Sequence, residues 1–145
     1  MTADQIRELV RLSYAAYFDG DREAFVDHFH DDIEWQFYSP PEALPIPNRV
    51  TGKVAVLAAL KRIDEVVEMV DDKLEVVVAD VDRAAVVSNR AVRLRANGRV
   101  LRYKVAAFHR YRDGKLIEYT AFLDGFDLLQ QTLGREIAVE QAYPE

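Results

Sequence analysis

The sequence predicts an α+β domain in which helices cover one face of a curved antiparallel sheet. The first half contains three segments with apolar residues at helical spacing, interrupted by one short strand-like run. The second half contains four runs in which apolar and polar residues alternate, as they do in strands with one buried face. A group of helices followed by consecutive strands is typical of α+β domains.

Two helices are expected near the N-terminus. Residues 3–18 form a helix that Thr2 or Asp4 caps and Gly20 ends. A second, short helix is expected to begin at Asp21 and to extend through Phe29. The inward stripe of the first helix consists of Ile6, Leu9, Val10, Ser13 and Tyr17.

A strand and a loop follow these helices. Residues 33–38 alternate, with Ile33, Trp35 and Phe37 on the apolar side, and are expected to form a strand. Residues 39–48 contain four prolines, which remove backbone donors and exclude regular structure, so this segment is expected to be a loop.

The third helix is expected from Thr51-Gly52 to about Val70. Asp71-Asp72 is expected to separate it from a strand. That strand would carry Leu74, Val76 and Val78 on one face.

The dipeptide Asn97-Gly98 is the strongest two-residue hairpin signal in the chain. A two-residue turn there pairs Arg90 with Val105 and Val92 with Tyr103. This register brings the apolar rows of the two strands onto the same face of the sheet.

A second hairpin is expected at Asp113-Gly114. A two-residue loop there would mix polar and apolar faces, so we expect a three-residue loop, 112–114, with Gly114 left-handed. This register pairs His109 with Ile117. It also pairs Ala107 with Tyr119.

After the last strand, Asp124 is expected to cap a closing helix that stops at Gly134. The chain therefore predicts a single domain over residues 1–134 and a C-terminal tail over residues 135–145.

Composition narrows the classes of function. The net charge of −6 argues against nucleic acid as the main partner. No apolar run is long enough for a membrane span, and no signal peptide is recognised. The chain has no cysteine, which excludes disulfides and thiolate metal sites and favours a cytoplasmic location.

Short phrases along the chain resemble those of the nuclear transport factor 2-like superfamily. They are Asp19-Gly20-Asp21, residues 29–35, Thr51-Gly52-Lys53 and residues 113–116. Within that superfamily the chain is most similar, over residues 5–133, to SnoaL-like polyketide cyclases, ketosteroid isomerases and limonene epoxide hydrolases. The resemblance implies a cone-shaped curved sheet packed on three N-terminal helices, with an interior pocket.

The active sites of those families are only partly matched. The three residues that ketosteroid isomerases need fall at Ser13, Phe37 and Ala107, so that isomerisation is not supported. Of the Asp–Arg–Asp set of the epoxide hydrolases, only the arginine is matched, by Arg90. The other positions of that site are held by Val92, Ala121, Trp35 and Phe37.

Three residues are the catalytic candidates. Arg90 lies on an apolar face and is expected to bind a carboxylate, phosphate or enolate; the alternative is an ion pair with a nearby acid. His109 would move a proton, or would be a hydrogen-bonded structural histidine under the closing helix. Tyr17 would offer its hydroxyl to the pocket, or would pack in the core. The expected substrate-binding residues are Trp35, Phe37, Val92, Val105, Ala107, Tyr119 and Ala121.

No metal or cofactor is expected. His28 and His30 lie among aspartates, but side chains two apart on a helix diverge and do not readily share one ion.

The outer face of the sheet is expected to place Arg93 opposite Arg102. Like charges in that position destabilise a sheet unless something compensates. The pair therefore favours a homodimer through the sheet face, with Glu75 or Glu118 supplying counter-charge.

Two functions remain open. The leading hypothesis is a SnoaL-like small-molecule enzyme, of isomerase, cyclase or hydrolase type, in which Arg90 stabilises negative charge on an apolar substrate. The competing hypothesis is a non-catalytic domain of the same fold that binds a hydrophobic ligand or dimerises.

Overall fold

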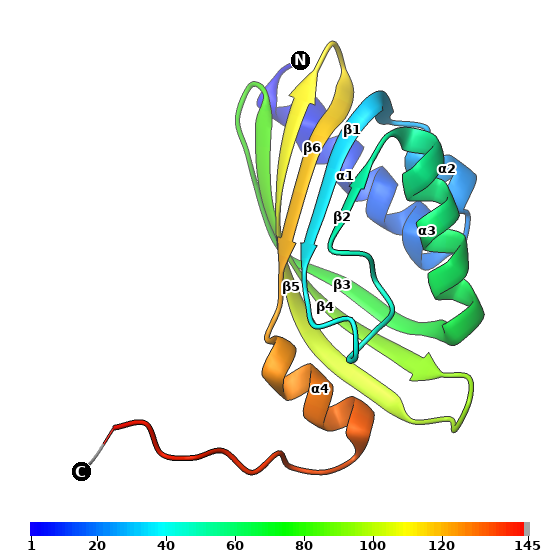
Figure 1. Cartoon of the computed structure of the whole chain (residues 1–145). Coiled ribbons are helices and arrows are strands. Elements are labelled where there is room, and N and C mark those ends of the chain that lie inside the picture. The colour runs from blue at the N-terminus through cyan, green and yellow to red at the C-terminus, as the bar shows by residue number, and fades with distance from the viewer. Residues whose placement is uncertain (144–145) are drawn as a thin grey trace.

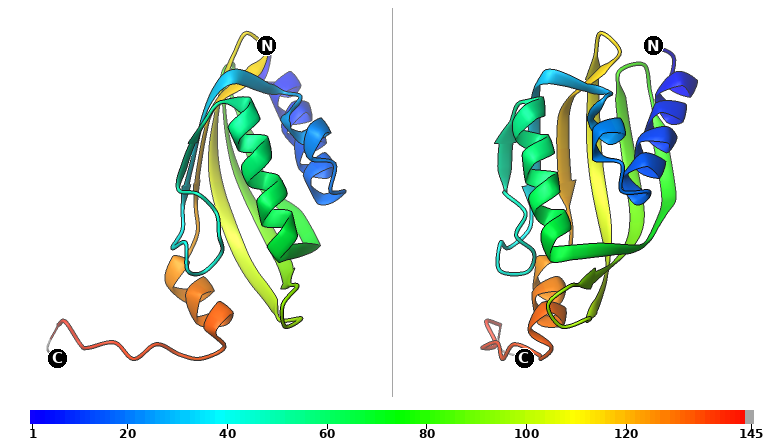
Figure 2. Two further views of the ribbon diagram at one scale, coloured as in Figure 1. Left: turned by 45° about the vertical axis from the view of Figure 1, so that its right-hand side comes forward. Right: turned by 90° about the vertical axis from the view of Figure 1, so that its right-hand side faces the viewer.

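The computed structural model describes residues 1–143, so the last two residues of the predicted tail lie outside the described part. A single curved sheet forms the body of the molecule, and three helices cover its concave face (Figures 1 and 2). The elements in chain order are α1 Ala3–Phe18, α2 Arg22–Val26, β1 Phe29–Tyr38, β2 Arg49–Thr51, α3 Lys53–Val66, β3 Val67–Ala79, β4 Arg83–Leu94, β5 Val100–Arg112, β6 Lys115–Phe122 and α4 Gly125–Leu133.

The six strands lie in the order β2-β1-β6-β5-β4-β3. Strands β1 and β6 run parallel, and the other neighbouring pairs run antiparallel. The predicted α+β architecture is confirmed. The short strand β2, which follows the proline-containing loop, was not expected.

The helix ends follow local sequence signals. Thr2 and Gln5 form a capping box at the start of α1. Asp124 caps α4 by accepting from the backbone of Asp127, and Gly134 ends it with φ of 72°. Helix α2 is shorter than expected, because Phe29 already belongs to β1.

The register predicted for the β4–β5 hairpin is wrong by two residues. Arg90 lies opposite Tyr103, and Val92 lies opposite Leu101. The turn contains more residues than Asn97 and Gly98 alone, since the Leu94 backbone N–H donates a hydrogen bond to the Arg99 carbonyl at 2.8 Å. A shift of two residues preserves the face on which each side chain lies, so Arg90 still points inward.

The β5–β6 register is also corrected. The loop has two residues, with Asp113 and Gly114 at φ of 53° and 74°, as in a type I′ turn. His109 lies opposite Tyr119 rather than Ile117, and Ala107 lies opposite Ala121. A β-bulge at Ile117 restores the match of the apolar faces that a two-residue loop alone would lose.

Strand β3 departs most from the prediction. It begins at Val67, before Asp71-Asp72, and contains two register shifts. The second shift turns Val76 and Val78 outward, where they are 44% and 59% exposed, whereas Leu74 packs against the core. A one-residue shift moves every following side chain to the other face.

The core fills the space between the concave face and helices α1 to α3. Helix α4 lies at one end of the sheet, and the tail leads away from it (Figure 1). The helices of the described chain are all too short or too polar to cross a bilayer.

Candidate functional site

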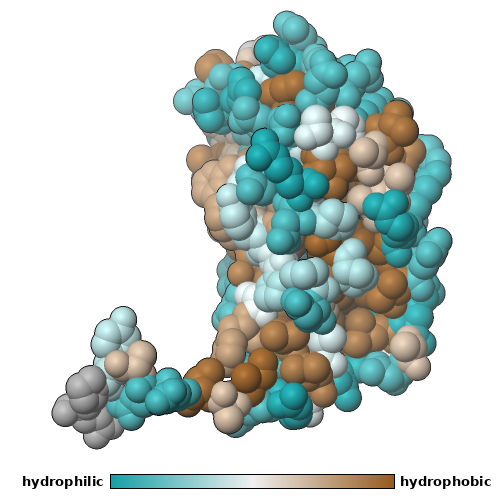
Figure 3. Space-filling view, in the orientation of Figure 1, coloured by the Kyte–Doolittle hydropathy of each residue, from teal (hydrophilic) through white to brown (hydrophobic). Residues whose placement is uncertain are grey.

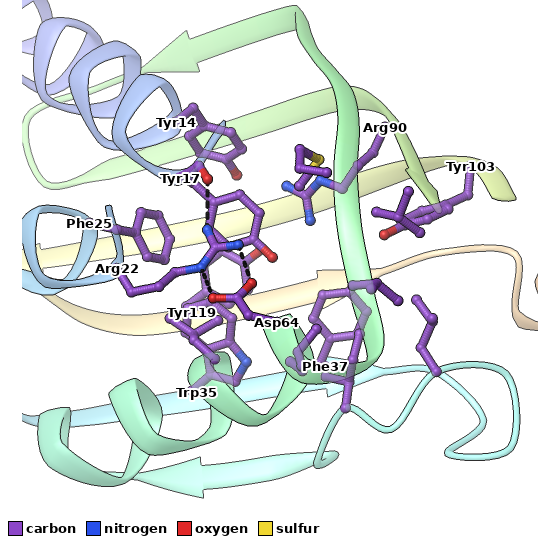
Figure 4. Close-up of a pocket in the computed structure, with 17 residues that line it drawn as sticks. Tyr14, Tyr17, Arg22, Phe25, Trp35, Phe37, Asp64, Arg90, Tyr103 and Tyr119 are labelled. Atoms are coloured by element: carbon purple, nitrogen blue, oxygen red, sulfur yellow. Dashed lines mark hydrogen bonds and ion pairs between the residues drawn. The ribbon is translucent and has the colours of Figure 1, made fainter. Parts of the chain in front are cut away.

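An interior cavity lies between the concave sheet face, α1, α2, α3 and the loop 39–48 (Figure 4). Its free volume is about 30 Å³, room for roughly two water molecules. Most of the wall is aromatic or aliphatic. It is lined by Tyr14, Tyr17, Arg22, Phe25, Trp35, Phe37, Leu44, Ile46, Leu60, Ile63, Asp64, Val67, Met69, Arg90, Val92, Tyr103 and Tyr119.

Two arginines reach this cavity, and the first makes three hydrogen bonds to the protein. Arg22 donates two hydrogen bonds to Asp64, at 2.8 and 2.6 Å, and a third to the Tyr17 carbonyl at 2.7 Å (Figure 4). This bidentate pair joins α2 to α3, and the third bond ties both to the end of α1. Arg22 therefore holds the three helices together.

The second arginine, Arg90, is much less engaged. Its side chain is 7% exposed, and its one acidic partner among the described residues is Asp72, at 3.4 Å. The Tyr103 hydroxyl also contacts it. The Arg90 Nε is buried without any partner. Because a guanidinium carries five N–H donors and keeps its charge, Arg90 retains donors for a further acceptor.

Asp72, the acid that contacts Arg90, does not line the cavity. Its side chain is 3% exposed, and its Oδ1 has no partner. Burial raises the pKa of Asp72, and the neighbouring Arg90 opposes that rise. The Arg90–Asp72 contact thus corresponds to the ion-pair alternative, yet neither group is satisfied by it.

Four tyrosines surround the guanidinium side of the cavity. The Tyr17 ring lies 3.9 Å from the Arg22 guanidinium and 4.8 Å from that of Arg90, both within cation–π range. Burial raises the pKa of Tyr103 to about 12, and the Arg90 charge opposes the rise. Tyr119 stacks on Trp35 at 3.9 Å between ring centroids. Burial also raises the pKa of Tyr14 and Tyr119, so the hydroxyls of Tyr14, Tyr103 and Tyr119 are neutral donors at pH 7.

His109 does not reach the cavity. It lies on the same sheet face, but it faces a separate space of about 10 Å³ towards the other end of β5. Its ring nitrogens contact the hydroxyls of Tyr111 and Tyr14, at 3.1 and 3.5 Å. His109 as a proton-transfer residue therefore stays a prediction, and it would act without lining the cavity. The alternative of a hydrogen-bonded histidine describes its contacts, although Tyr14 of α1, and not the closing helix, lies over it.

The remaining predicted residues divide into two groups. Tyr17, Trp35, Phe37, Val92 and Tyr119 line the cavity together with Arg90. Val105, Ala107 and Ala121 are buried on the same face but do not line the cavity.

Sequence reasoning missed five polar residues of the site, of which Arg22 gave no signal beyond its place in a short helix. Tyr14 and Tyr103 carried a signal, since Tyr14 follows Val10 by one helical turn and Tyr103 lies in an apolar row. Asp64 and Asp72 carried none. The position of Asp64 in its helix pattern is the same as that of an ordinary exposed residue. Asp72 faces inward only because of the register shift after Met69.

Similarity to known proteins agrees with this geometry. Residues 10–119 match the family model for the SnoaL-like domain. The chain belongs to the SnoaL-like domain family. Among curated proteins, none matches the sequence.

Three solved structures resemble this SnoaL-like protein in fold. A candidate isomerase from Rhodopseudomonas palustris has 28% identity and a TM-score of 0.79, covering 93% of this chain and 100% of its own. A candidate polyketide cyclase from Xanthomonas campestris has 19% identity, a TM-score of 0.77 and coverage of 91% and 99%. An LEH-like epoxide hydrolase from M. tuberculosis has 17% identity, a TM-score of 0.73 and 92% coverage of both chains. The fold is NTF2-like.

Proposed function

We propose that this SnoaL-like protein is a small-molecule enzyme acting on an apolar, cyclic or unsaturated substrate, with Arg90 stabilising negative charge on a substrate oxygen. The observation behind this proposal is the contrast between Arg22, which makes three hydrogen bonds to Asp64 and Tyr17, and Arg90, whose buried Nε has no partner within residues 1–143. A buried guanidinium with unused donors stabilises an oxyanion more strongly than water stabilises it.

The lining residues support an isomerase or cyclase type of reaction through an enol or enolate. Phe25, Trp35 and Phe37 offer an apolar wall to a ring system, and Arg90 lies at one side of it (Figure 4). Asp64 is the one carboxylate among the lining residues, and Arg22 holds both of its oxygens. Tyrosine hydroxyls, with Tyr17 next to Arg90 as the first candidate, would therefore donate a hydrogen bond to the substrate oxygen. The proton that leaves carbon would pass to a water molecule in the cavity.

Ligand binding can be measured without knowing the substrate. Trp35 is the single tryptophan of the chain and lines the cavity, so its fluorescence reports on occupancy. We expect 4-nitrobenzoate, a quenching aromatic anion, to bind about tenfold more tightly than the uncharged 4-nitrobenzamide, since a hydrogen bond to a charged group contributes about 1.5–3 kcal/mol. The preference should vanish in Arg90→Met/Asp72→Leu. Equal affinities in the wild-type protein would contradict the anion site.

Catalysis is tested by proton exchange. Cyclic ketones with a β,γ double bond, incubated in D₂O, should gain deuterium next to the carbonyl, as mass spectrometry would show. Loss of Arg90 in the same double variant should slow exchange about 10²–10³-fold, the usual cost of losing an oxyanion donor. The alternative is a non-catalytic ligand-binding protein. It is favoured by the pairing of Asp64 with Arg22, because a carboxylate with both oxygens held is a poor base. Anion binding without exchange in any ketone tested would select that alternative.

A further inference from the structure

A chain of three buried polar side chains begins at the cavity wall and leads away from it. Tyr14 lines the cavity, and its hydroxyl lies 3.5 Å from His109 Nε2. The other ring nitrogen, Nδ1, lies 3.1 Å from the Tyr111 hydroxyl. Tyr14, His109 and Tyr111 are all buried, and neither His109 nor Tyr111 touches the cavity.

The imidazole in this chain is neutral at pH 7. Burial lowers the pKa of His109 to about 4. The polar groups that share its small space are Ser13 and Tyr14 from α1, Tyr111 from β5, Tyr119 from β6, and His28. No carboxylate, lysine or arginine lines that space within residues 1–143. One ring nitrogen is therefore a donor and the other an acceptor.

The position of the ring hydrogen follows from Tyr111. Its hydroxyl makes one side-chain hydrogen bond within the described chain, to Nδ1. The space beside it, about 10 Å³, is at or below what a water molecule needs. A buried donor that makes no bond is costly, so Tyr111 donates to Nδ1. That places the imidazole hydrogen on Nε2, from which it points to the Tyr14 oxygen.

Tyr14 must then direct its own hydrogen elsewhere, because its oxygen accepts from His109. Its ring lies at the edge of the cavity, with the hydroxyl on the side of Arg90 (Figure 4). Resting on the proposed function, we propose that Tyr111 and His109 are positioning residues that fix the Tyr14 hydroxyl as a hydrogen-bond donor into the cavity, where it binds the same ligand oxygen as Arg90.

The ring hydrogen can be observed directly by NMR. The chain has three histidines, so ring ¹⁵N signals are few, and His109→Gln identifies those of His109. We expect wild-type His109 at pH 7 to show Nε2 protonated and Nδ1 bare. In Tyr111→Phe the two shifts should move towards each other, because both tautomers become populated. A wild-type ring with its hydrogen on Nδ1, or averaged between the two nitrogens, would overturn the inference.

The second measurement is a double-mutant cycle with 4-nitrobenzoate and Trp35 fluorescence. Tyr14→Phe should weaken binding about tenfold, and Tyr111→Phe should weaken it several-fold although its hydroxyl touches no ligand. The double variant should bind no more weakly than Tyr14→Phe alone, because Tyr111 acts only through Tyr14. Additive effects, or unchanged binding in Tyr111→Phe, contradict the proposal.

Leu116→Val is the matched control. Leu116 lines the same small space as His109 and Tyr111 but forms no side-chain hydrogen bond. The control should lower the melting temperature and leave the dissociation constant unchanged. If 4-nitrobenzoate does not bind the wild-type protein, the proposed function fails, and the NMR measurement still decides the role of Tyr111 and His109.

Discussion

Arg22 and Arg90 touch the ring of the same tyrosine but have different partners. Arg22 has a well-formed bidentate carboxylate partner, whereas Arg90 has a single contact of 3.4 Å with Asp72. In both pairs, removing one partner leaves a charge that water reaches poorly. The Asp72 side chain is the more buried acid, 3% exposed against 33% for Asp64.

The stability of Arg90 variants follows from this burial. Arg90→Met should lower the free energy of unfolding by about 3–5 kcal/mol, because it abandons the buried Asp72 carboxylate. Arg90→Met/Asp72→Leu should recover most of that loss, since no charge is then left without a partner. Urea unfolding at pH 7 measures both. Wild-type stability in Arg90→Met would show that Asp72 is not charged in the folded protein.

His109 should make the protein sensitive to acid. Its pKa falls from 6.5 in the unfolded chain to about 4 in the fold, so the unfolded state takes up a proton first. The stabilisation is complete above pH 6.5 and is lost as the pH falls towards 4, by about 3 kcal/mol at 1.36 kcal/mol per pKa unit. Unfolding of wild type and His109→Gln, compared across this window, isolates the effect. Parallel pH profiles would contradict it.

Among the elements, the loop 39–48 is the part of the cavity wall without regular structure. Leu44 and Ile46 line the cavity from this loop, and the Thr132 hydroxyl of α4 donates to the Ala43 carbonyl at 2.8 Å. Hydrophobic surface gathers around α4 at the same end of the molecule (Figure 3). Since the cavity is smaller than an aromatic ring, ligand entry requires a wall to move, and we expect this loop to be the one.

Thr132→Val tests the loop. It removes one hydrogen bond, of about 1 kcal/mol, at nearly constant volume. Hydrogen exchange at the Ala43 and Ile46 amides should quicken, and 4-nitrobenzoate should bind faster by stopped-flow fluorescence. Thr120→Val, on the other side of the sheet, is the control and should change neither rate. An unchanged entry rate in Thr132→Val would place the entrance elsewhere.

At the scale of the whole molecule, Arg93 and Arg102 do not form the like-charged pair that would favour a dimer. Arg93 lies opposite Val100, and Arg102 lies opposite Ala91, so the expected pair of facing arginines is absent. Arg93 contacts Glu68 at 3.6 Å instead.

The outer sheet face carries an exposed aromatic cluster instead of a facing pair of arginines. Tyr38, Phe108 and Phe122 are 48%, 55% and 43% exposed, and Tyr38 stacks on Phe122 at 4.7 Å. Exposed apolar clusters of this kind mark interaction surfaces.

We still expect a homodimer through this face, now held by the aromatic cluster. Phe108→Arg should produce a monomer in sedimentation at micromolar concentration, because two such faces could not meet without burying unpaired charge. Phe126→Arg on α4, at a comparably exposed position, should leave the dimer intact. A wild-type monomer under these conditions would exclude the interface.

Outside β3, where two register shifts turn side chains to the other face, the sequence alone determined which strand side chains face the interior. Alternation along a strand is a local property, so Arg90, Trp35, Phe37 and Tyr119 were placed on the inward face even though both hairpin registers were wrong. A two-residue shift, or a two-residue loop combined with a bulge, leaves that alternation intact.

Only the tertiary structure decided which inward side chains meet. A register shift after Met69 brings Asp72 against Arg90, and nothing local in the sequence announces it. His109 and Arg90 share a face yet lie in different spaces, because Tyr14 and Tyr119 fill the distance between them. Position along a strand and the packing of large rings depend on neighbours far away in the chain. The contacts within the site therefore depend on the tertiary fold, although the sequence predicts that most of its strand residues point inward.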